Sequence, residues 1–396
     1  MSEHKAVPNI RFKGFEDKWR RITISEVGSV TTGNTPSTKQ ARYYSKKGVP
    51  WITPSNIEKN GKVYNVKHLS NEGEKIGRIV PKGSVLVTSI ASIGKNTLLK
   101  EDSAFNQQIN AITPNKKYNS YFLYTACNQV SKKMKDIASA GTMQIVNKKE
   151  FSRMLIICPL LLEQKKIGNF FAKLDKLLDL QQQKIDKLEL LKKALLQKLF
   201  PKHDADIPEL RFKGFNDEWK SYLLGKIAVF INGRAFKQNE LLDKGKYPVL
   251  RVGNFYTNDK WFYSDLELPE KLYANKGDLL YTWSATFGPH IWKGDKVIYH
   301  YHIWKIIFSS EVSKQFALQM LLNDKEELMN NTNGSTMIHL TKNEMEKKVV
   351  KIPIKPEQQK IGNLLSKVDQ LIELENKKLQ DFQQVKKCLL QNMFVE

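Results

Sequence analysis

The sequence has few cysteines, no long hydrophobic segment and a shortage of acidic residues. Its three cysteines, Cys127, Cys158 and Cys388, are widely spaced, and none belongs to a CxxC pair. An odd number of scattered thiols argues against a disulfide framework and is typical of a reducing cytoplasm. No run of 18 apolar residues occurs, and the segment MSEHKAVPNI lacks the apolar core of a signal peptide. We therefore expect a cytoplasmic protein that does not enter a membrane.

The usual signatures of catalysis are also missing. The sequence has no GxGxxG or GxxxxGK[ST] phosphate loop, no HExxH motif, no GxSxG elbow and no Asn-Pro-Pro-aromatic tetrapeptide of amino-methyltransferases. His300 and His302 would share one face of a strand, which permits a metal. Such a pair more often packs or hydrogen-bonds, so we predict no metal site. These absences favour binding over catalysis.

Positive charge is what the sequence has in excess. Its 64 Lys and Arg residues against 41 Asp and Glu residues give a formal net charge of +23. Such a surplus attracts polyanions, usually nucleic acid, with an anionic membrane as the alternative. The length of 396 residues, with 41% hydrophobic and 10% aromatic residues, suits two or more folded domains.

The chain contains one framework twice. Residues 8–19 (PNIRFKGFEDKW) and 208–219 (PELRFKGFNDEW) agree at 8 of 12 positions, at an offset of 200. Residues 163–200 and 357–394 agree at 17 of 38 positions, at an offset of 194. The offset changes between Gly33 and Gly83, so we expect loops there, where recognition residues are often found. Similar ends and divergent interiors predict one scaffold that presents two different readers.

The pattern within each copy predicts an α+β fold. Short β-prone runs, 84–90 and 110–113 in the first copy and 279–283 and 303–308 in the second, alternate with Gly, Pro and Asn. Helix-like stretches follow at 120–138 and 311–329, and then a short strand that leads to a proline. We expect recognition domains at 1–157 and 201–351, each followed by a long helix, at 158–200 and 352–396.

Each long helix carries an apolar seam at three- and four-residue spacing, broken at Gln181/Glu375 and Lys192/Lys386. The seam residues that we expect to pair are Ile167, Leu174, Leu178, Ile185, Leu188, Leu195, Ile361, Val368, Ile372, Leu379, Phe382 and Leu389. Pro201 ends the first helix. We predict that the two helices pair as an antiparallel coiled coil, which relates the copies by a pseudo-two-fold axis and separates the two globular domains. The alternative is that each helix packs on its own domain.

Polar loops at equivalent places in the two copies are the candidate DNA-binding sites. DNA recognition needs cations for phosphates, and short polar or bidentate side chains for base edges. The candidates in the first copy are Asn34, Thr35, Ser37, Lys39, Arg42, Ser55, Asn56, Ser92, Lys95, Asn106, Gln107, Gln108 and Gln144. Those in the second copy are Arg234, Lys237, Arg251, Asn254, Tyr256, Trp283, Ser284, His290, His300 and His302. Any one loop could be an ordinary polar turn, and the coincidence across two copies is the stronger evidence. We interpret RFKGF and the repeated glycines as structural.

The chain resembles the specificity subunit of type I restriction–modification systems. The resemblance rests on RFKGFxDxW at the start of both halves, on SIG at 92–94 with TFG at 286–288, and on PLLLEQKKIGNFFAKLD and IPIKPEQQKIGNLLSKVD at the long helices. It implies two target-recognition domains, each reading half of a split double-stranded DNA site. It also implies helices that act as spacer and dock two modification (methyltransferase) subunits, joined by restriction (ATP-dependent nuclease) subunits. S-adenosylmethionine, ATP and Mg would bind those partners, and no cofactor would bind this chain.

We expect the partner subunits on faces near Leu177 and Leu371, because the helices have more apolar positions (Leu177, Leu180, Leu190, Leu196) than one seam needs. FNQQ at 105–108 corresponds to YHYH at 299–302, so base contacts there should differ between the halves. Two other classes stay open: a self-contained DNA-modifying enzyme, and an RNA-binding or architectural adaptor.

Overall fold

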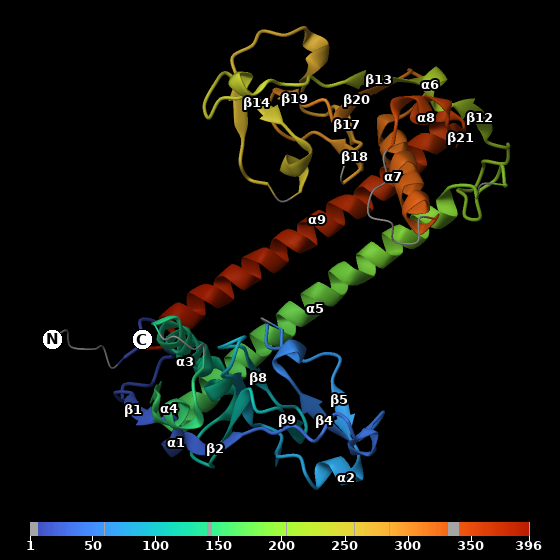
Figure 1. The fold of residues 1–396 in the computed structure, drawn as a ribbon. Helices are drawn as coiled ribbons and strands as arrows, with labels where there is room; N and C mark the ends of the chain where they lie inside the picture. The colour runs from blue at the N-terminus through green and yellow to red at the C-terminus, as the bar shows by residue number, and fades with distance from the viewer. Residues whose placement is uncertain are drawn as a thin grey trace. The chain divides into compact units, whose positions relative to one another are not determined.

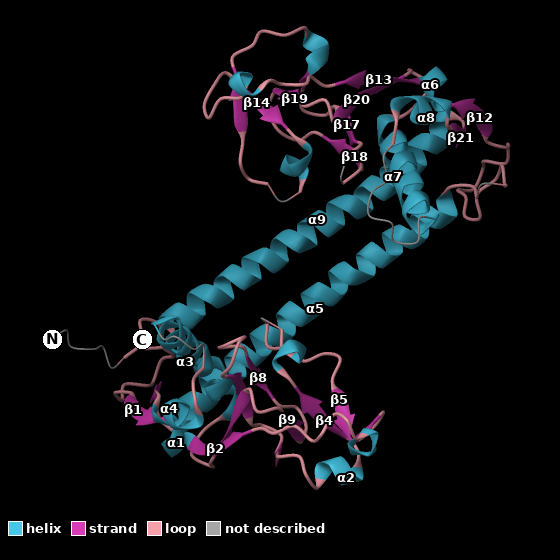
Figure 2. Cartoon of the chain, in the orientation of Figure 1, coloured by secondary structure: helices cyan, strands magenta, loops and turns pink. Residues whose placement is uncertain are grey.

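The computed structural model describes residues 7–58, 60–140, 145–202, 204–256, 258–284, 286–331 and 340–395, apart from the side chains of Ala140 and Asn331. The chain divides into two units, Met1–Gln182 with Lys378–Glu396, and Gln183–Lys377. Each unit therefore contains the interior of one copy together with part of both long helices (Figures 1 and 2).

The first unit is built around a four-stranded antiparallel sheet with the order β2-β10-β7-β8. Its strands are β2 (Gly28–Thr32), β7 (Val85–Thr88), β8 (Asn96–Leu98) and β10 (Ile109–Pro114). Every residue of β7 is buried, as in a strand covered on both faces. Val85 and Val87 join the core formed with α3 (Ser120–Ala140), while Leu86 belongs to a core on the other face. Alternate side chains of one strand thus enter two different cores.

A second sheet packs against the first through the core that contains Leu86. Its order is β3-β5-β4-β9-β6, and β4 and β9 are parallel. Its strands are β3 (Tyr44–Ser45), β4 (Val49–Ile52), β5 (Lys67–Leu69), β6 (Ile79–Val80) and β9 (Ser103–Phe105). The turns η1 (Ala41–Tyr43) and η2 (Pro54–Asn56) and the helix α2 (Asn71–Glu74) connect these strands. Ile52 and Phe105 pack with Leu86, which holds the two sheets together.

The remaining elements lead to the first long helix. Strands β1 (Arg20–Thr23) and β11 (Leu155–Cys158) form a two-stranded sheet beside α1 (Ile24–Val27). Helix α4 (Lys148–Arg153) begins at Asn147, whose side chain and that of Glu150 form a capping box. Helix α5 (Leu161–Leu199) follows and ends two residues before Pro201.

The second unit repeats this architecture. Its four-stranded sheet has the order β13-β20-β17-β18, with β13 (Ala228–Asn232), β17 (Leu279–Thr282), β18 (Gly288–Ile291) and β20 (Ile303–Phe308). Its other large sheet has the order β15-β14-β19-β16, with β14 (Tyr247–Leu250), β15 (Phe262–Ser264), β16 (Tyr273–Ala274) and β19 (Val297–Tyr299). This second sheet thus has four strands, whereas its counterpart in the first unit has five. The difference falls in the region where the offset between the two copies changes.

The helices of the second unit also match those of the first. Strands β12 (Lys220–Leu223) and β21 (Val349–Ile352) pair beside α6 (Leu224–Ile227), and a Thr341–Glu344 capping box starts α8 (Lys342–Lys347). Helix α7 (Lys314–Asn331) covers the core, and α9 (Lys355–Asn392) is the second long helix. The turns are η3 (Gln238–Glu240), η4 (Val252–Phe255) and η5 (Glu270–Leu272). The predicted α+β class, strands, helices and internal repeat are confirmed.

Ion pairs join α5 to α9 within each unit. In the first unit Lys386 Nζ lies 2.5 Å from Asp175 Oδ1, and in the second unit Lys192 Nζ lies 2.5 Å from Asp369 Oδ1. These pairs are related by the repeat offset, and the second unit adds Lys184–Glu375 at 2.9 Å. Partner numbers fall along α9 as they rise along α5, so the joined segments are antiparallel. Three of the four breaks in the apolar seam, Glu375, Lys192 and Lys386, are therefore positions of ionic contact.

Both helices also complete globular cores. Ile167 and Leu174 pack in the first core, as the alternative to mutual pairing anticipated, and Leu195 packs against the second. Leu389 of α9 contacts the first core, and Phe394, two residues after the end of α9, packs its ring against Trp19, Phe122 and Phe171. Our expectation that Leu196 is a surplus exposed position is wrong: its side chain is buried in the second core.

Candidate nucleic-acid interface

Two of the predicted loops in the first unit meet at Gly33. A Cβ atom on Gly33 would lie 2.2 Å from the carbonyl oxygen of Phe105 and 2.3 Å from that of Asn106. Glycine therefore lets residues 33–42 approach the 105–108 turn closely. Asn34 N donates to Phe105 O at 2.9 Å, and Thr35 Oγ1 donates to Gln107 Oε1 at 2.6 Å. In the second unit Gly233 makes the same approach to Tyr299 and His300.

Several first-unit candidates are available to a ligand. These are the exposed Thr35, Ser37, Lys39, Arg42, Ser55, Ser92 and Gln107. Four others, Asn34, Asn56, Lys95 and Gln108, are partly buried and hydrogen-bonded within the protein. The guanidinium of Arg42 donates to Gln40, forms an ion pair with Glu72 and lies over the ring of Tyr43. Ser92 lies on a loop in which Ala91 has φ 62° and Gly94 has φ 82°, and this loop packs on α3 at Ser131. Gln144 lies outside the described residues.

Other candidates use their side chains within the protein. Asn56 Oδ1 accepts from Thr53 N, and its Nδ2 donates to the carbonyl oxygens of Tyr64 and Asn65. Asn254 repeats this: its Oδ1 accepts from Arg251 N, and its Nδ2 donates to Asn258 O and Lys260 O. Asn106 is buried and donates to Gln108 Oε1 at 2.8 Å. These amides shape the loops that carry the exposed candidates.

The second unit has rings where the first has amides. Trp283, His300 and His302 are partly buried and in mutual aromatic contact, with ring centroids of Trp283 and His302 4.9 Å apart and of His300 and His302 5.1 Å apart. Arg234 lies over the ring of Phe236 and donates to Glu240 at 2.5 Å. Lys237 is exposed and Ser284 is partly buried.

A second group surrounds His290. Its ring stacks on Phe255 with a centroid distance of 4.1 Å, and its Nε2 lies 3.1 Å from the hydroxyl of exposed Tyr256. Burial, and then the charge of Lys325, lowers the pKa of His290 to about 4. Burial, and then the neighbouring charge of His302, lowers the pKa of His300 to about 4. Both imidazoles are neutral at pH 7, so they offer hydrogen bonds and apolar surface to a ligand, and no positive charge. Arg251 stacks over Phe262 at 4.3 Å.

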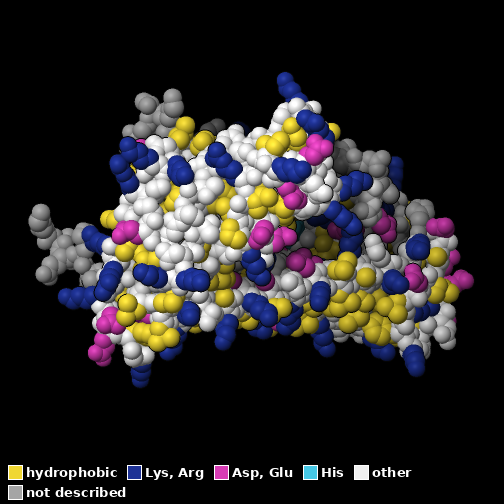
Figure 3. Space-filling model, turned by 90° about the horizontal axis from the view of Figure 1, so that it is seen from below, with side chains coloured by type: hydrophobic (Ala, Val, Ile, Leu, Met, Phe, Trp, Pro, Cys, Tyr) yellow, Lys and Arg dark blue, Asp and Glu magenta, His cyan; other side chains and the backbone are white. Residues whose placement is uncertain are grey.

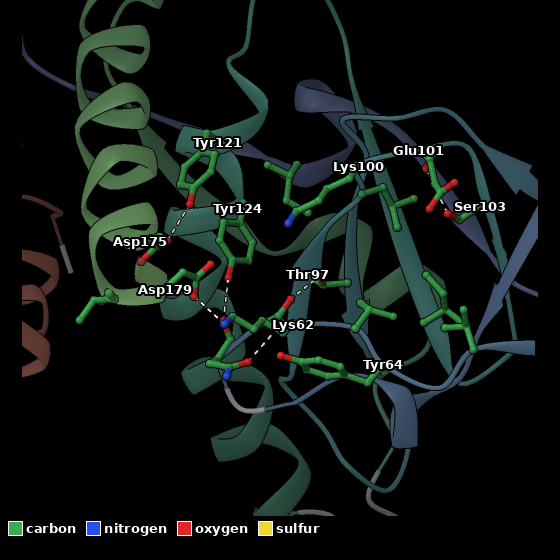
Figure 4. A pocket seen from close by; sticks show the side chains of 18 of the residues that line it. Lys62, Tyr64, Thr97, Lys100, Glu101, Ser103, Tyr121, Tyr124, Asp175 and Asp179 are labelled. Atoms are coloured by element: carbon green, nitrogen blue, oxygen red, sulfur yellow. Dashed lines mark hydrogen bonds and ion pairs between the residues drawn. The ribbon is translucent and has the colours of Figure 1, made fainter. Parts of the chain in front are cut away.

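A pocket of about 710 Å³ lies in the first unit (Figure 4). Apolar and aromatic side chains line it, including Val63, Tyr64, Leu98, Leu178 and Leu379. Polar side chains of the lining are paired with one another. Lys62 Nζ lies 2.5 Å from Asp179 Oδ1, and the Tyr121 hydroxyl donates to Asp175 at 2.6 Å. The ion pair between Lys62 and Asp179 thus joins the 56–66 loop to α5 at the edge of the pocket. Figure 4 shows Lys100 pointing into the pocket toward Tyr121 and Tyr124.

Basic side chains are spread over the face shown in Figure 3, mingled with hydrophobic patches. Among the described residues, no group of three or more His, Cys, Asp and Glu side chains could hold a metal ion. In the same part of the chain, no helix is both long enough and apolar enough to cross a membrane.

Sequence reasoning missed three features. Arg11, within RFKGF, forms two hydrogen bonds with Glu163, at 2.7 and 2.8 Å, and Arg211 does the same with Glu357. The signal was present, because all four residues lie in the repeated segments. The ring contacts that join Tyr301 and Phe236 to His300, and the Lys62–Asp179 pair, were also missed, because side-chain contacts between distant segments leave no local pattern.

Comparisons with known proteins agree with this architecture. The model of the "Type I restriction modification DNA specificity domain" matches residues 16–190 and 216–384. The MjaIX specificity subunit of a type I restriction enzyme from Methanocaldococcus jannaschii is 27% identical over 94% of this chain and 91% of its own length. The HindI specificity subunit from Haemophilus influenzae is 30% identical, over 39% of this chain and 36% of that protein.

A solved structure has the same fold. The S subunit of a type I restriction–modification system from M. genitalium has a TM-score of 0.63 at 16% identity, and the match covers 98% of this chain and 99% of that one. The two segments matched by the family model take up most of the sequence. The chain belongs to the family of the type I restriction modification DNA specificity domain.

Proposed function

We propose that this protein is the DNA-recognition (specificity) subunit of a type I restriction–modification complex. It reads a bipartite, asymmetric site in double-stranded DNA, and each unit contributes one reader. As a recognition subunit it is not itself a catalyst, and the methyl transfer and DNA cleavage take place on its partners. The family match and the specificity subunits among its relatives support this role.

One observation carries the proposal. Equivalent turns, held against the equivalent glycines Gly33 and Gly233, present Gln107 and Gln108 in one unit and His300, Tyr301 and His302 in the other. A repeated scaffold with different chemistry at the equivalent position is what two half-sites of unlike sequence require. Amides can contact base edges in pairs of hydrogen bonds, whereas rings contact base faces and methyl groups.

The exposed leucines of the long helices support two partner sites. Leu177 and Leu180 on α5 are 43% and 53% exposed, and Leu371 and Leu374, at the repeat offset on α9, are 46% and 49% exposed. Two equivalent apolar patches suit two copies of one modification subunit, which would bring S-adenosylmethionine. Restriction subunits with ATP and Mg would complete the nuclease.

The partner proposal is tested by native mass spectrometry of the chain mixed with its modification subunit. We expect two copies to bind, and the pair of changes Leu177→Ser and Leu180→Ser to remove one of them. Leu371→Ser with Leu374→Ser is the matched variant and should remove the other. If both folded variants still bound two copies, these patches would not be the docking sites.

The DNA proposal is tested by mapping the adenines that the reconstituted complex methylates. We expect two short specified segments of different sequence separated by unspecified bases, and one uninterrupted site would refute it. Replacing the block 33–144 with that of another family member should change one half-site only. Gln107→Ala should relax particular base positions, whereas Lys39→Ala should weaken all sequences alike and reduce the salt slope by about 0.9.

A further inference from the structure

The turn between β19 and β20 carries an exposed aromatic group. Tyr301 is 39% exposed at the tip of the turn, and its ring lies 4.5 Å from that of His300 and 3.8 Å from that of His302. Trp283 lies beneath, 4.9 Å from His302, and stacks on buried Trp304 at 5.7 Å. We call Tyr301, His300, His302 and Trp283 the aromatic tip. It is a continuous column of rings that runs from the core to the surface.

The backbone of the tip is fixed from several directions. Tyr301 N donates to Arg234 O at 3.0 Å, and His300 N donates to Leu250 O at 2.9 Å. Within the turn, Ile303 N donates to His300 O at 2.9 Å. The indole Nε1 of Trp283 donates to Tyr301 O at 3.0 Å. A turn whose backbone is held this way loses little conformational freedom when a ligand covers it, which favours binding at this point.

Cations flank the tip. Phe236 stacks parallel to His300 at 6.5 Å, and the guanidinium of Arg234 lies 5.4 Å above Phe236. Lys237 follows and is exposed. Arg234 is paired with Glu240, so exposed Lys237 is the cation offered to a phosphate, while the exposed ring contacts bases.

We propose that Tyr301 inserts beside the bases of the second half-site and unstacks one base step. This inference rests on the proposed function and deepens it. Aromatic and apolar wedges of this kind kink a duplex at the step they enter. The equivalent turn of the first unit carries amides, so the distortion is confined to one half-site. Because pyrimidine–purine steps unstack most easily, part of the specificity of the second reader comes from DNA deformability.

The test uses the complex with its modification subunits and duplexes that contain the mapped site. 2-Aminopurine, which brightens when it is unstacked, replaces one base at a time. Methyltransferases flip their target base out of the stack, so the methylated adenine is left out of the comparison. At the other positions of the second half-site, we expect brightening at one when the complex binds. Tyr301→Ala should abolish the signal and weaken binding about 5- to 150-fold, the range for loss of one stacked base. Tyr301→Phe, which keeps the ring, should retain the signal. Tyr222→Ala, which removes an equally exposed tyrosine of β12 in the same unit, is the matched control and should also retain it.

Three results would overturn the proposal. The first is specific binding by the wild-type complex without brightening at any position of the second half-site other than the methylated adenine. The second is a folded Tyr301→Ala protein that retains both signal and affinity. The third is a Tyr301→Ala protein that binds DNA normally and loses its modification subunits, since the tip would then be a protein contact. In all three the proposed DNA-recognition function stands. If the wild-type complex bound no specific duplex, both proposals would fall.

Discussion

Asp175 of α5 accepts a hydrogen bond from the Tyr121 hydroxyl and forms an ion pair with Lys386 of α9. One carboxylate thereby connects the first globular core to both long helices. At the repeat offset, Asp369 of α9 accepts from Gln319 Nε2 at 2.9 Å and pairs with Lys192 of α5. The side chains of Asp175 and Asp369 are only 23% and 35% exposed, which limits screening by solvent.

Asp175→Asn should destabilise the first unit. The change keeps the size of the side chain and removes the charge that holds Lys386 and Tyr121, so we expect a loss of about 1–3 kcal/mol. Hydrogen exchange of α3 and of the C-terminal turn of α9 would measure it. Asp369→Asn is the matched control and should raise exchange in α7 instead. Equal effects of the two variants on both units would contradict this assignment.

Phe394 should matter for the first unit although it lies at the far end of the chain. Its ring centroid lies 5.4 Å from that of Phe122 and 6.2 Å from that of Trp19. Phe394→Ala should therefore destabilise the first unit by about 3–5 kcal/mol, as other buried phenylalanine truncations do. Denaturant unfolding followed by hydrogen exchange would assign the loss to one unit.

Phe200 supplies the matched variant for that measurement. It packs on Phe316 at 5.4 Å and on Trp219 at 6.0 Å in the second core. Phe200→Ala should lower the unfolding free energy of the second unit by a similar amount. The core around Trp19 should stay protected from hydrogen exchange. If Phe394→Ala changed neither unit, the segment that follows α9 would not be part of the first core.

The second unit should lose stability on mild acidification. Its His290 and His300 have pKa values of about 4 when folded, below the unfolded value near 6.5. Between these values the unfolded chain binds more protons, so stability falls as pH drops from about 6.5 to 4. Asp324 acts in the opposite sense, because burial raises its pKa. Comparison of the unfolding free energy of His290→Gln with that of the wild type isolates the histidine, and we expect a flatter pH profile in the variant.

The repeat, the fold class and most elements could be predicted because they depend on periodicity, turn residues and the comparison of two copies. Strand 303–308 and the helix from Ser120 follow directly from such patterns. Side-chain roles could not be predicted in the same way. Asn56 and Asn254 resemble base-reading amides in the sequence, yet their hydrogen bonds close their own loops. Tyr301 is prominent only because folding places Trp283 and Arg234 beside it. The base contacts of either reader stay predictions.

The last prediction concerns the length of the paired helices, which we propose sets the unspecified spacer in the DNA site. Removal of one heptad shortens a helix by about 10 Å of rise, close to three base pairs of DNA. Removal of a heptad from one helix alone would misalign the ion pairs that join α5 to α9. Matching deletions of 185–191 and 379–385 each end just before a pairing lysine, Lys192 and Lys386, so both ion pairs are kept.

We expect the double deletion to bind a spacer about three base pairs shorter while both half-sites stay the same. A binding screen across duplexes of varied spacer length would measure this. The deletion of 185–191 alone is the control, and we expect it to bind poorly at every spacer because its seam is out of register. A folded double deletion with the wild-type spacer preference would show that something other than helix length fixes the distance between the half-sites.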